Sequence, residues 1–261
     1  MADRAAPVSA GLIGRCFVHP IFDYLLIGGG LSLIVIPTVY WLSGRSAMLY
    51  SSTLPWFILS TNSAHFAAST LRLYSKPGAR DALPFLTLVL PALTLGALTL
   101  CLFAADSIGR YVQLIYLTWS PYHYAAQAYG LAVMYCVRSG CHLTKRQKHA
   151  LWWIAILPFF KVLLFALSKH AAAWVVPEHL LWNDADWRSG VDWLSMILGC
   201  LALVLPLVLF GQVWLTTGRS MPLISLLVIL ANALWFVVFP ILDGFIWTTI
   251  FHGVQYLAIV M

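Results

Sequence analysis

The stretch from Tyr111 to Val137, YVQLIYLTWSPYHYAAQAYGLAVMYCV, decides how the rest of the chain is interpreted. It exceeds the about 20 apolar residues that a helix needs to cross a bilayer, and it carries His123 and Gln127 near its middle. An imidazole or a carboxamide at that depth loses its water, so the protein must supply its partners. Helical spacing of three or four residues places the polar and amphipathic side chains on one stripe, namely Tyr116, Trp119, Ser120, His123, Gln127 and Gly130.

Pro121 interrupts this helix two residues before His123. Proline has no backbone N–H, and its ring crowds the carbonyl four residues earlier, here that of Leu117. We therefore expect the helix to kink where its polar stripe is densest.

The composition excludes an ordinary soluble domain. Hydrophobic residues make up 61% of the 261 residues, charged residues only 9%, and 12 residues are tryptophan, which is far from the averages of globular proteins. We predict an all-α, polytopic helical membrane protein in which residues 1–261 form a single integral membrane domain. The net charge of +6 does not indicate a nucleic-acid partner, because the basic residues cluster in short loops, where they set membrane orientation.

Apolar runs of membrane-spanning length predict about eight transmembrane helices in one bundle. Their approximate bounds are 21–43, 51–72, 83–105, 111–137, 150–168, 192–216, 221–240 and 244–261. Only the turn signal Asp243-Gly244 separates the last two. The sequence stops at Met261 without a polar flank, from which we expect a C-terminally truncated chain.

The basic residues predict the orientation of these spans. Of the 15 Lys and Arg residues, 10 fall in the N-terminal tail and around the loops after the second, fourth and sixth spans, and 4 fall in the alternate loops. By the positive-inside rule the N-terminus is cytoplasmic, in a bacterial-type inner or cell membrane.

Two further spans carry a histidine among polar neighbours. The second holds Thr61, Asn62, His65, Ser69 and Arg72 along one helix face, and the last holds Thr248, Thr249, His252, Gln255 and Tyr256. We interpret His65, His123 and His252 as candidate metal or haem ligands at a shared interior site. Hydrogen bonding to neighbouring helices is the alternative for each of them. At about 1.5 Å per residue their depths differ by about 10 Å, so a tight cluster needs helix tilt or a kink at Pro121.

The polar residues around the histidines suggest their roles. We expect His123 and Gln127 to be catalytic and four further residues to bind the cofactor. Tyrosine and tryptophan offer an amphipathic wall, and an amide can orient an imidazole. Neutral imidazoles suit iron, copper or haem. The four cofactor-binding candidates are Tyr116, Trp119, Gln255 and Tyr256.

Three functions are compatible with this pattern. The first is metal- or haem-dependent redox or oxygen chemistry on a lipophilic small molecule inside the membrane. The second is a transporter-like carrier, suggested by prolines that interrupt the apolar runs, although no inverted repeat is evident. The third is a non-catalytic membrane scaffold or assembly factor whose buried polar groups simply bond to one another.

Other functional classes find no support. The sequence contains neither of the nucleotide-binding patterns GxxxxGK[ST] and GxGxxG, and the hydrolase pattern GxSxG does not occur. The five cysteines are an odd set that implies no disulfide framework. We expect the partners to be the lipid bilayer and a lipophilic small molecule, with other membrane subunits as an open alternative and no nucleic acid.

Overall fold

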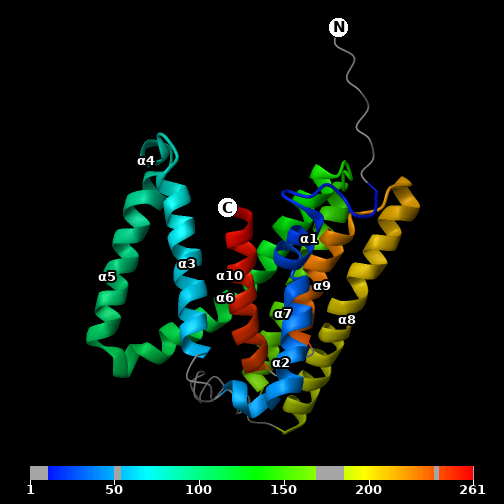
Figure 1. Ribbon diagram of the computed structural model, residues 1–261. Coiled ribbons are helices and arrows are strands. Elements are labelled where there is room, and N and C mark those ends of the chain that lie inside the picture. Colours follow the sequence, from blue (N-terminus) through cyan, green and yellow to red (C-terminus); the bar gives the residue numbers. More distant parts are fainter. Residues whose placement is uncertain (1–10, 50–53, 169–184, 238–240, 261) are drawn as a thin grey trace.

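The fold is all-helical. The computed structural model describes residues 11–49, 54–168, 185–237 and 241–260, and these residues contain no strand. The predicted all-α class is therefore confirmed (Figure 1). In chain order, with η marking π-helical turns, the elements are α1 (Pro20–Phe22), η1 (Asp23–Ile27), α2 (Gly30–Leu49), α3 (Leu54–Tyr74), α4 (Ala79–Ala82), η2 (Phe85–Val89), α5 (Leu90–Phe103), α6 (Ala105–Arg138), α7 (Lys145–Ser168), α8 (Ala185–Thr217), α9 (Leu223–Val237) and α10 (Ile241–Val260).

The described parts of the eight predicted spans are helical, the first of them with a break at Gly28 and Gly29, but fewer helices satisfy the length and apolarity expected of a membrane span. Among the described residues, Phe85–Phe103 and Ser189–Thr217 do so. The pair Pro20–Ile27 and Gly30–Leu42, bent by 58°, makes a third if it counts as one span. The polar stripes of α3 and α6 lower their mean hydropathy, while α9 and α10 contribute shorter apolar helices. The structure thus supports two or three spans by these criteria, and eight spans stay a prediction.

The bend in the first pair occurs at Gly28 and Gly29. Gly29 has a φ of +81°, in the left-handed region that favours glycine, and a Cβ there would lie 2.9 Å from the Cβ of Ala231. The carbonyl of Ile27, which the break releases from helical bonding, accepts a hydrogen bond from Nε2 of Gln255 at 3.0 Å. The bend therefore fits the start of α2 closely against α9 and α10.

Asp23 fastens the N-terminal segment to the bundle. Its carboxylate is fully buried and accepts hydrogen bonds from the backbone N–H groups of Phe17 and Val18 and from the hydroxyl of Tyr135, at 2.5, 3.1 and 2.8 Å. A buried carboxylate needs such donors to offset its lost hydration. Pro20 is the first residue of α1, so these bonds tie the start of that helix to the segment before it.

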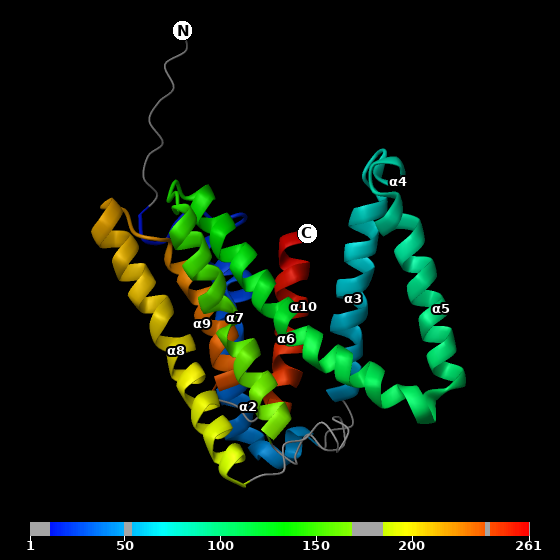
Figure 2. The ribbon, with the colours of Figure 1, turned by 180° about the vertical axis from the view of Figure 1, so that it is seen from behind.

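The main core lies between α6, α7, α8 and α9. Large side chains that are fully or almost fully buried fill it, including Tyr135, Leu151, Val213 and Ile224. Beside this bundle, α3, α4 and α5 form an arm that meets it through α3, which lies against α10 (Figures 1 and 2). In the helical segment Phe85–Phe103 only 6% of the apolar window is buried. The arm thus exposes a helix that is apolar all round.

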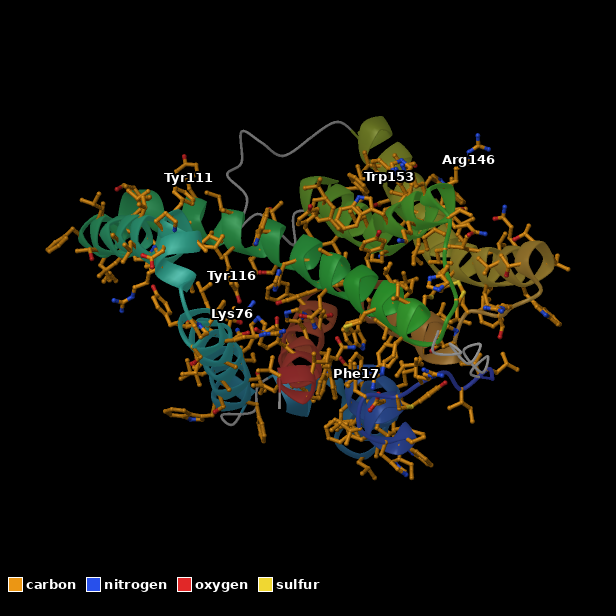
Figure 3. All side chains as sticks on the ribbon, turned by 90° about the horizontal axis from the view of Figure 1, so that it is seen from above. Phe17, Lys76, Tyr111, Tyr116, Arg146 and Trp153 are labelled. Carbon is orange, nitrogen blue, oxygen red and sulfur yellow. The ribbon has the colours of Figure 1, made fainter. Side chains whose placement is uncertain are left out.

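The basic connections lie at one end of the molecule. The α3–α4 turn, the α6–α7 loop and the α8–α9 turn are all at the upper end in Figure 1. Lys76 and Arg219 lie in two of these turns and Arg146 in the first turn of α7, and Lys76 and Arg146 are labelled in the view from that end (Figure 3). The helices therefore run through one layer with positive charge gathered on one face of it.

Candidate metal centre

Three histidines from three helices meet inside the helical layer. His65 is on α3, His123 on α6 and His252 on α10, and their candidate ligand nitrogens all lie within 4.8 Å of one another. The ring centroids are 4.9 Å apart for His123 and His252, 5.0 Å for His65 and His252, and 6.0 Å for His65 and His123. Among the described residues this is the only group of three or more His, Cys, Asp or Glu side chains close enough to share a metal ion.

The central position of α10 explains how the three side chains converge. Seen from above, α10 lies between α3 and α6 (Figure 3). Gly253, next to His252, faces α3, where a Cβ would come within 3.1 Å of the Thr61 carbonyl oxygen. The missing side chain lets the two helices approach closely, as small residues do in helix interfaces. His252 is thereby brought to the level of His65.

Two nitrogens of the cluster are buried without hydrogen-bond partners. These atoms are Nδ1 of His65 and Nε2 of His252. A buried polar atom without a partner loses its hydration, and no hydrogen bond offsets the free-energy cost. Both atoms are of the kind that ligates transition metals. The donors present therefore fit a bound metal ion.

Aromatic rings and hydroxyl groups surround the imidazoles. The ring of Tyr256 stands edge-on to His65, with centroids 4.2 Å apart. The ring of Tyr124 lies 4.4 Å from that of His252, and its hydroxyl is hydrogen-bonded to Thr249 at 2.8 Å. These rings hold two of the three imidazoles in place and shield them on the protein side.

The other predicted site residues lie at different distances from this centre. Tyr256 contacts it directly, and Nε2 of Gln127 is buried without a partner, as a group that meets a ligand would be. Tyr116 accepts a hydrogen bond from Asn62 at the edge of the site, at 3.4 Å. Trp119 is 61% exposed, and its indole packs on the ring of Tyr122.

Gln255 has a structural partner that the sequence did not indicate. The prediction was that its amide orients an imidazole or contacts a bound molecule. Its amide nitrogen donates a hydrogen bond to the carbonyl of Ile27, because the break at Gly28 and Gly29 leaves that carbonyl free, and the contact with an imidazole or bound molecule stays a prediction. This contact directs Gln255 toward the first helix pair.

Two residues near the core were missed by the sequence reasoning. Tyr124 lies beside His252 on α10. It directly follows His123, which also contacts His252, so α10 meets two consecutive residues of α6. Asn232 on α9 is 2% exposed, and both polar atoms of its side chain are buried without a partner. A single amide in the apolar run LLVILANALWFVV is the signal that indicates such a residue.

No family model, no curated protein and no solved structure matches this chain. The interpretation of the site therefore depends on its own geometry.

Proposed function

We propose that this chain is an integral membrane protein that holds a transition-metal ion between His65, His123 and His252 and uses it for redox or oxygen chemistry on a lipophilic substrate. One observation carries the proposal. Three imidazoles from three different helices converge within 4.8 Å, and two of their nitrogens are buried without any other partner. Purely structural histidines would be expected to find hydrogen-bond partners on neighbouring helices.

The membrane setting is supported by the apolar exterior and by the charge at one end. Large hydrophobic side chains cover the outside of the helices, among them Trp41, Leu102, Phe103 and Leu215, each at least 80% exposed. In water such a surface would drive aggregation. We propose that the helices cross the bilayer as eight spans, with the basic connections in the cytoplasm.

The geometry favours a single ion over haem. A haem iron binds its two axial imidazoles on opposite faces of a flat macrocycle. Here the three ring centroids form a nearly regular triangle with sides of 4.9 to 6.0 Å, so the third imidazole stands where the macrocycle of any pair would lie. A compact ion has no such conflict. To bind such an ion, the three nitrogens must come within roughly 3.4 Å of one another, because metal–nitrogen bonds are about 2.0 to 2.1 Å long.

The protein's own groups would hold the ion and keep water away from it. All three ligands are imidazoles, and no carboxylate or thiolate belongs to the group. The ion supplies the redox chemistry when bound. Tyr124 and Tyr256 wall the site, and Gln127, one helical turn after His123 on α6, has an amide nitrogen that is buried without a partner.

Metal content tests this proposal. We expect detergent-purified protein to contain about one equivalent of iron, copper or manganese per chain by elemental analysis, without a haem Soret band, because the three ligands form one site. Each of His65→Ala, His123→Ala and His252→Ala should lower that content severely. His149→Ala is the matched control, since His149 is exposed on α7 and bonds to Trp153. A metal-free wild-type protein, prepared without chelator, would favour the carrier or scaffold functions instead.

A further inference from the structure

We propose that the substrate reaches the histidines sideways from the bilayer, between α3 and α6, and that it is an uncharged molecule with a long hydrocarbon chain and one polar end. We call the space between these two helices, at Asn62 and Tyr116, the seam. The inference rests on the proposed function, because it takes the helices as embedded in lipid. It adds the route and the chemical class of the substrate.

The cluster is open on one side only. His65 and His252 are buried, with 6% and 2% of their surfaces exposed, whereas His123 is exposed. The opening is therefore on the side of α6. Tyr116 lies on the same helix, between α6 and α3 in the view from above (Figure 3).

The site lies in the middle of the helical layer. His65 is 11 residues after the start of α3 at Leu54 and 9 residues before its end at Tyr74, so about 14 to 16 Å of helix separates it from either end. A water-soluble substrate would have to cross half of the apolar layer. A molecule already dissolved in the bilayer starts at the right depth.

The surface residues near Tyr116 and His65 in sequence are apolar. Ile115, Trp119 and Phe66 are 67%, 61% and 58% exposed, and they flank Tyr116 and His65 in sequence. None of them carries a charge, and a charged group is expensive at this depth. This apolar exterior therefore suits a hydrocarbon chain.

One weak hydrogen bond bridges the seam. Nδ2 of Asn62 donates to the hydroxyl of Tyr116 over 3.4 Å, which is long for such a bond. A hydroxyl or carbonyl oxygen on the substrate can insert between them and accept from both Nδ2 of Asn62 and the Tyr116 hydroxyl, so that neither polar group is left unpaired. Asn62 lies one helical turn from His65 and Tyr116 two turns from His123, so this polar end would sit about 5 to 10 Å from the metal site. The reacting position then lies within the hydrocarbon chain.

Photolabelling from the lipid phase tests the route without any need for metal. The wild-type protein is placed in phosphatidylcholine vesicles that contain a phospholipid with a diazirine near the middle of its acyl chain, and labelled residues are mapped by peptide mass spectrometry. We expect label on His123 and Tyr116 as well as on the exposed Trp119. Tyr122 is the internal negative control, because it is packed against Trp152 and Phe159. Label on Trp119 without label on His123 or Tyr116 would overturn the proposal.

A pair of variants tests the bridging hydrogen bond. Tyr116→Phe removes the acceptor but keeps the ring that packs near Phe245, so labelling of His123 should rise several-fold. Tyr122→Phe is matched in residue type and helix and should leave the labelling unchanged. Equal labelling of His123 in Tyr116→Phe and wild type would contradict a role for this bond.

A comparison of two chelators connects the route to the metal. In vesicles, lipid-soluble diphenylphenanthroline should remove the metal at least about tenfold faster than its disulfonated form, because sulfonates are excluded from the bilayer interior. Equal rates would mean that the metal is reached from water and would overturn the lateral route. If the protein holds no metal, the proposed function fails, whereas photolabelling still decides whether the seam opens to lipid.

Discussion

At the scale of single residues, Asp23 shows how a buried charge can serve the fold. Two backbone N–H groups and a tyrosine hydroxyl bond to its carboxylate, so its burial is compensated by three donors. Asp23 and His19 are four residues apart at the start of the first helix. The structure adds that the carboxylate bonds to the residues before that helix, while Nδ1 of His19 accepts a weak bond from Ile21.

Replacing this carboxylate should destabilise the protein. Hydrogen bonds to charged groups contribute about 1.5 to 3 kcal/mol each, so Asp23→Ala is expected to cost at least about 3 kcal/mol of unfolding free energy. Thermal unfolding in detergent would measure the loss as a lower Tm. Asp81→Ala is the control, because Asp81 is exposed on α4. Equal Tm values for the two variants would refute the anchoring role of Asp23.

Gly253 controls the distance between two of the histidines. A Cβ at this position would be 3.1 Å from the Thr61 carbonyl oxygen, so Gly253→Val should push α10 away from α3 and separate His252 from His65. We expect lower metal content and a lower Tm, with a destabilisation of about 1 to 3 kcal/mol from overpacking. Gly130→Val is the comparison, since no atom lies within 4 Å of a Cβ there. Unchanged metal content in Gly253→Val would argue against the close contact.

Cys141, in the α6–α7 loop, should show a pH-dependent reactivity. The Cys136 thiol beside it and the positive charge of Arg219 lower the pKa of Cys141 despite its burial. The thiolate is the reactive form, so alkylation of Cys141 by iodoacetamide should rise with pH in a lower pH range than alkylation of an ordinary thiol. In contrast, burial raises the pKa of the Cys16 thiol.

Peptide mass spectrometry after alkylation at several pH values would give the midpoint for each cysteine. Arg219→Gln removes a positive charge that favours the thiolate, so it should move the Cys141 midpoint to higher pH. A midpoint that stays in place would show that Arg219 has no influence on this thiol.

At the scale of helices, α6 joins the arm to the bundle and carries the site. It continues from Ala105 to Arg138 with Pro121 inside it, so the proline does not end the helix. Its neighbouring residues His123 and Tyr124 both meet His252 on α10. The polar stripe seen in the sequence is thus only partly directed inward, because Trp119 lies on the exposed surface.

The exposed helix α5 offers a test of the membrane setting. Leu95 is 69% exposed, and on a surface that faces water Leu95→Lys would change stability by less than about 0.5 kcal/mol. Within a bilayer the same change should cost about 2.5 to 3.5 kcal/mol and reduce the amount of inserted protein. Quantifying membrane-fraction protein would measure this, with Leu12→Lys, outside the helices, as the control. A normal level of Leu95→Lys would contradict a lipid-facing α5.

At the scale of the whole molecule, the basic connections gather at one end. This arrangement predicts that Lys76, Lys145 and Lys148 all face the cytoplasm. A membrane-impermeant amine reagent should therefore modify all three in inside-out vesicles and none in right-side-out vesicles, as read by peptide mass spectrometry. Labelling of Lys76 from the opposite side to Lys148 would show that the stretch between them crosses the membrane an odd number of times.

The sequence by itself determined the helical class, the positions of the helices and the three histidine-bearing segments. These are properties of local periodicity and composition, which do not depend on distant contacts. The alternation of basic and acidic loops likewise follows from the order of residues alone. The sequence could not establish how many helices are membrane spans, because polar stripes and short helices weaken the hydropathy signal.

Only the tertiary structure decided which polar residues meet. Depth counted along each helix separated the histidines by about 10 Å, but the close approach at Gly253 and Thr61 and the relative positions of α3, α6 and α10 bring their rings within 6.0 Å. Gln255 likewise found its partner in a carbonyl exposed by a break 228 residues away in sequence. Such contacts depend on the register between helices, which is fixed by packing of side chains far apart in the chain and has no local signature.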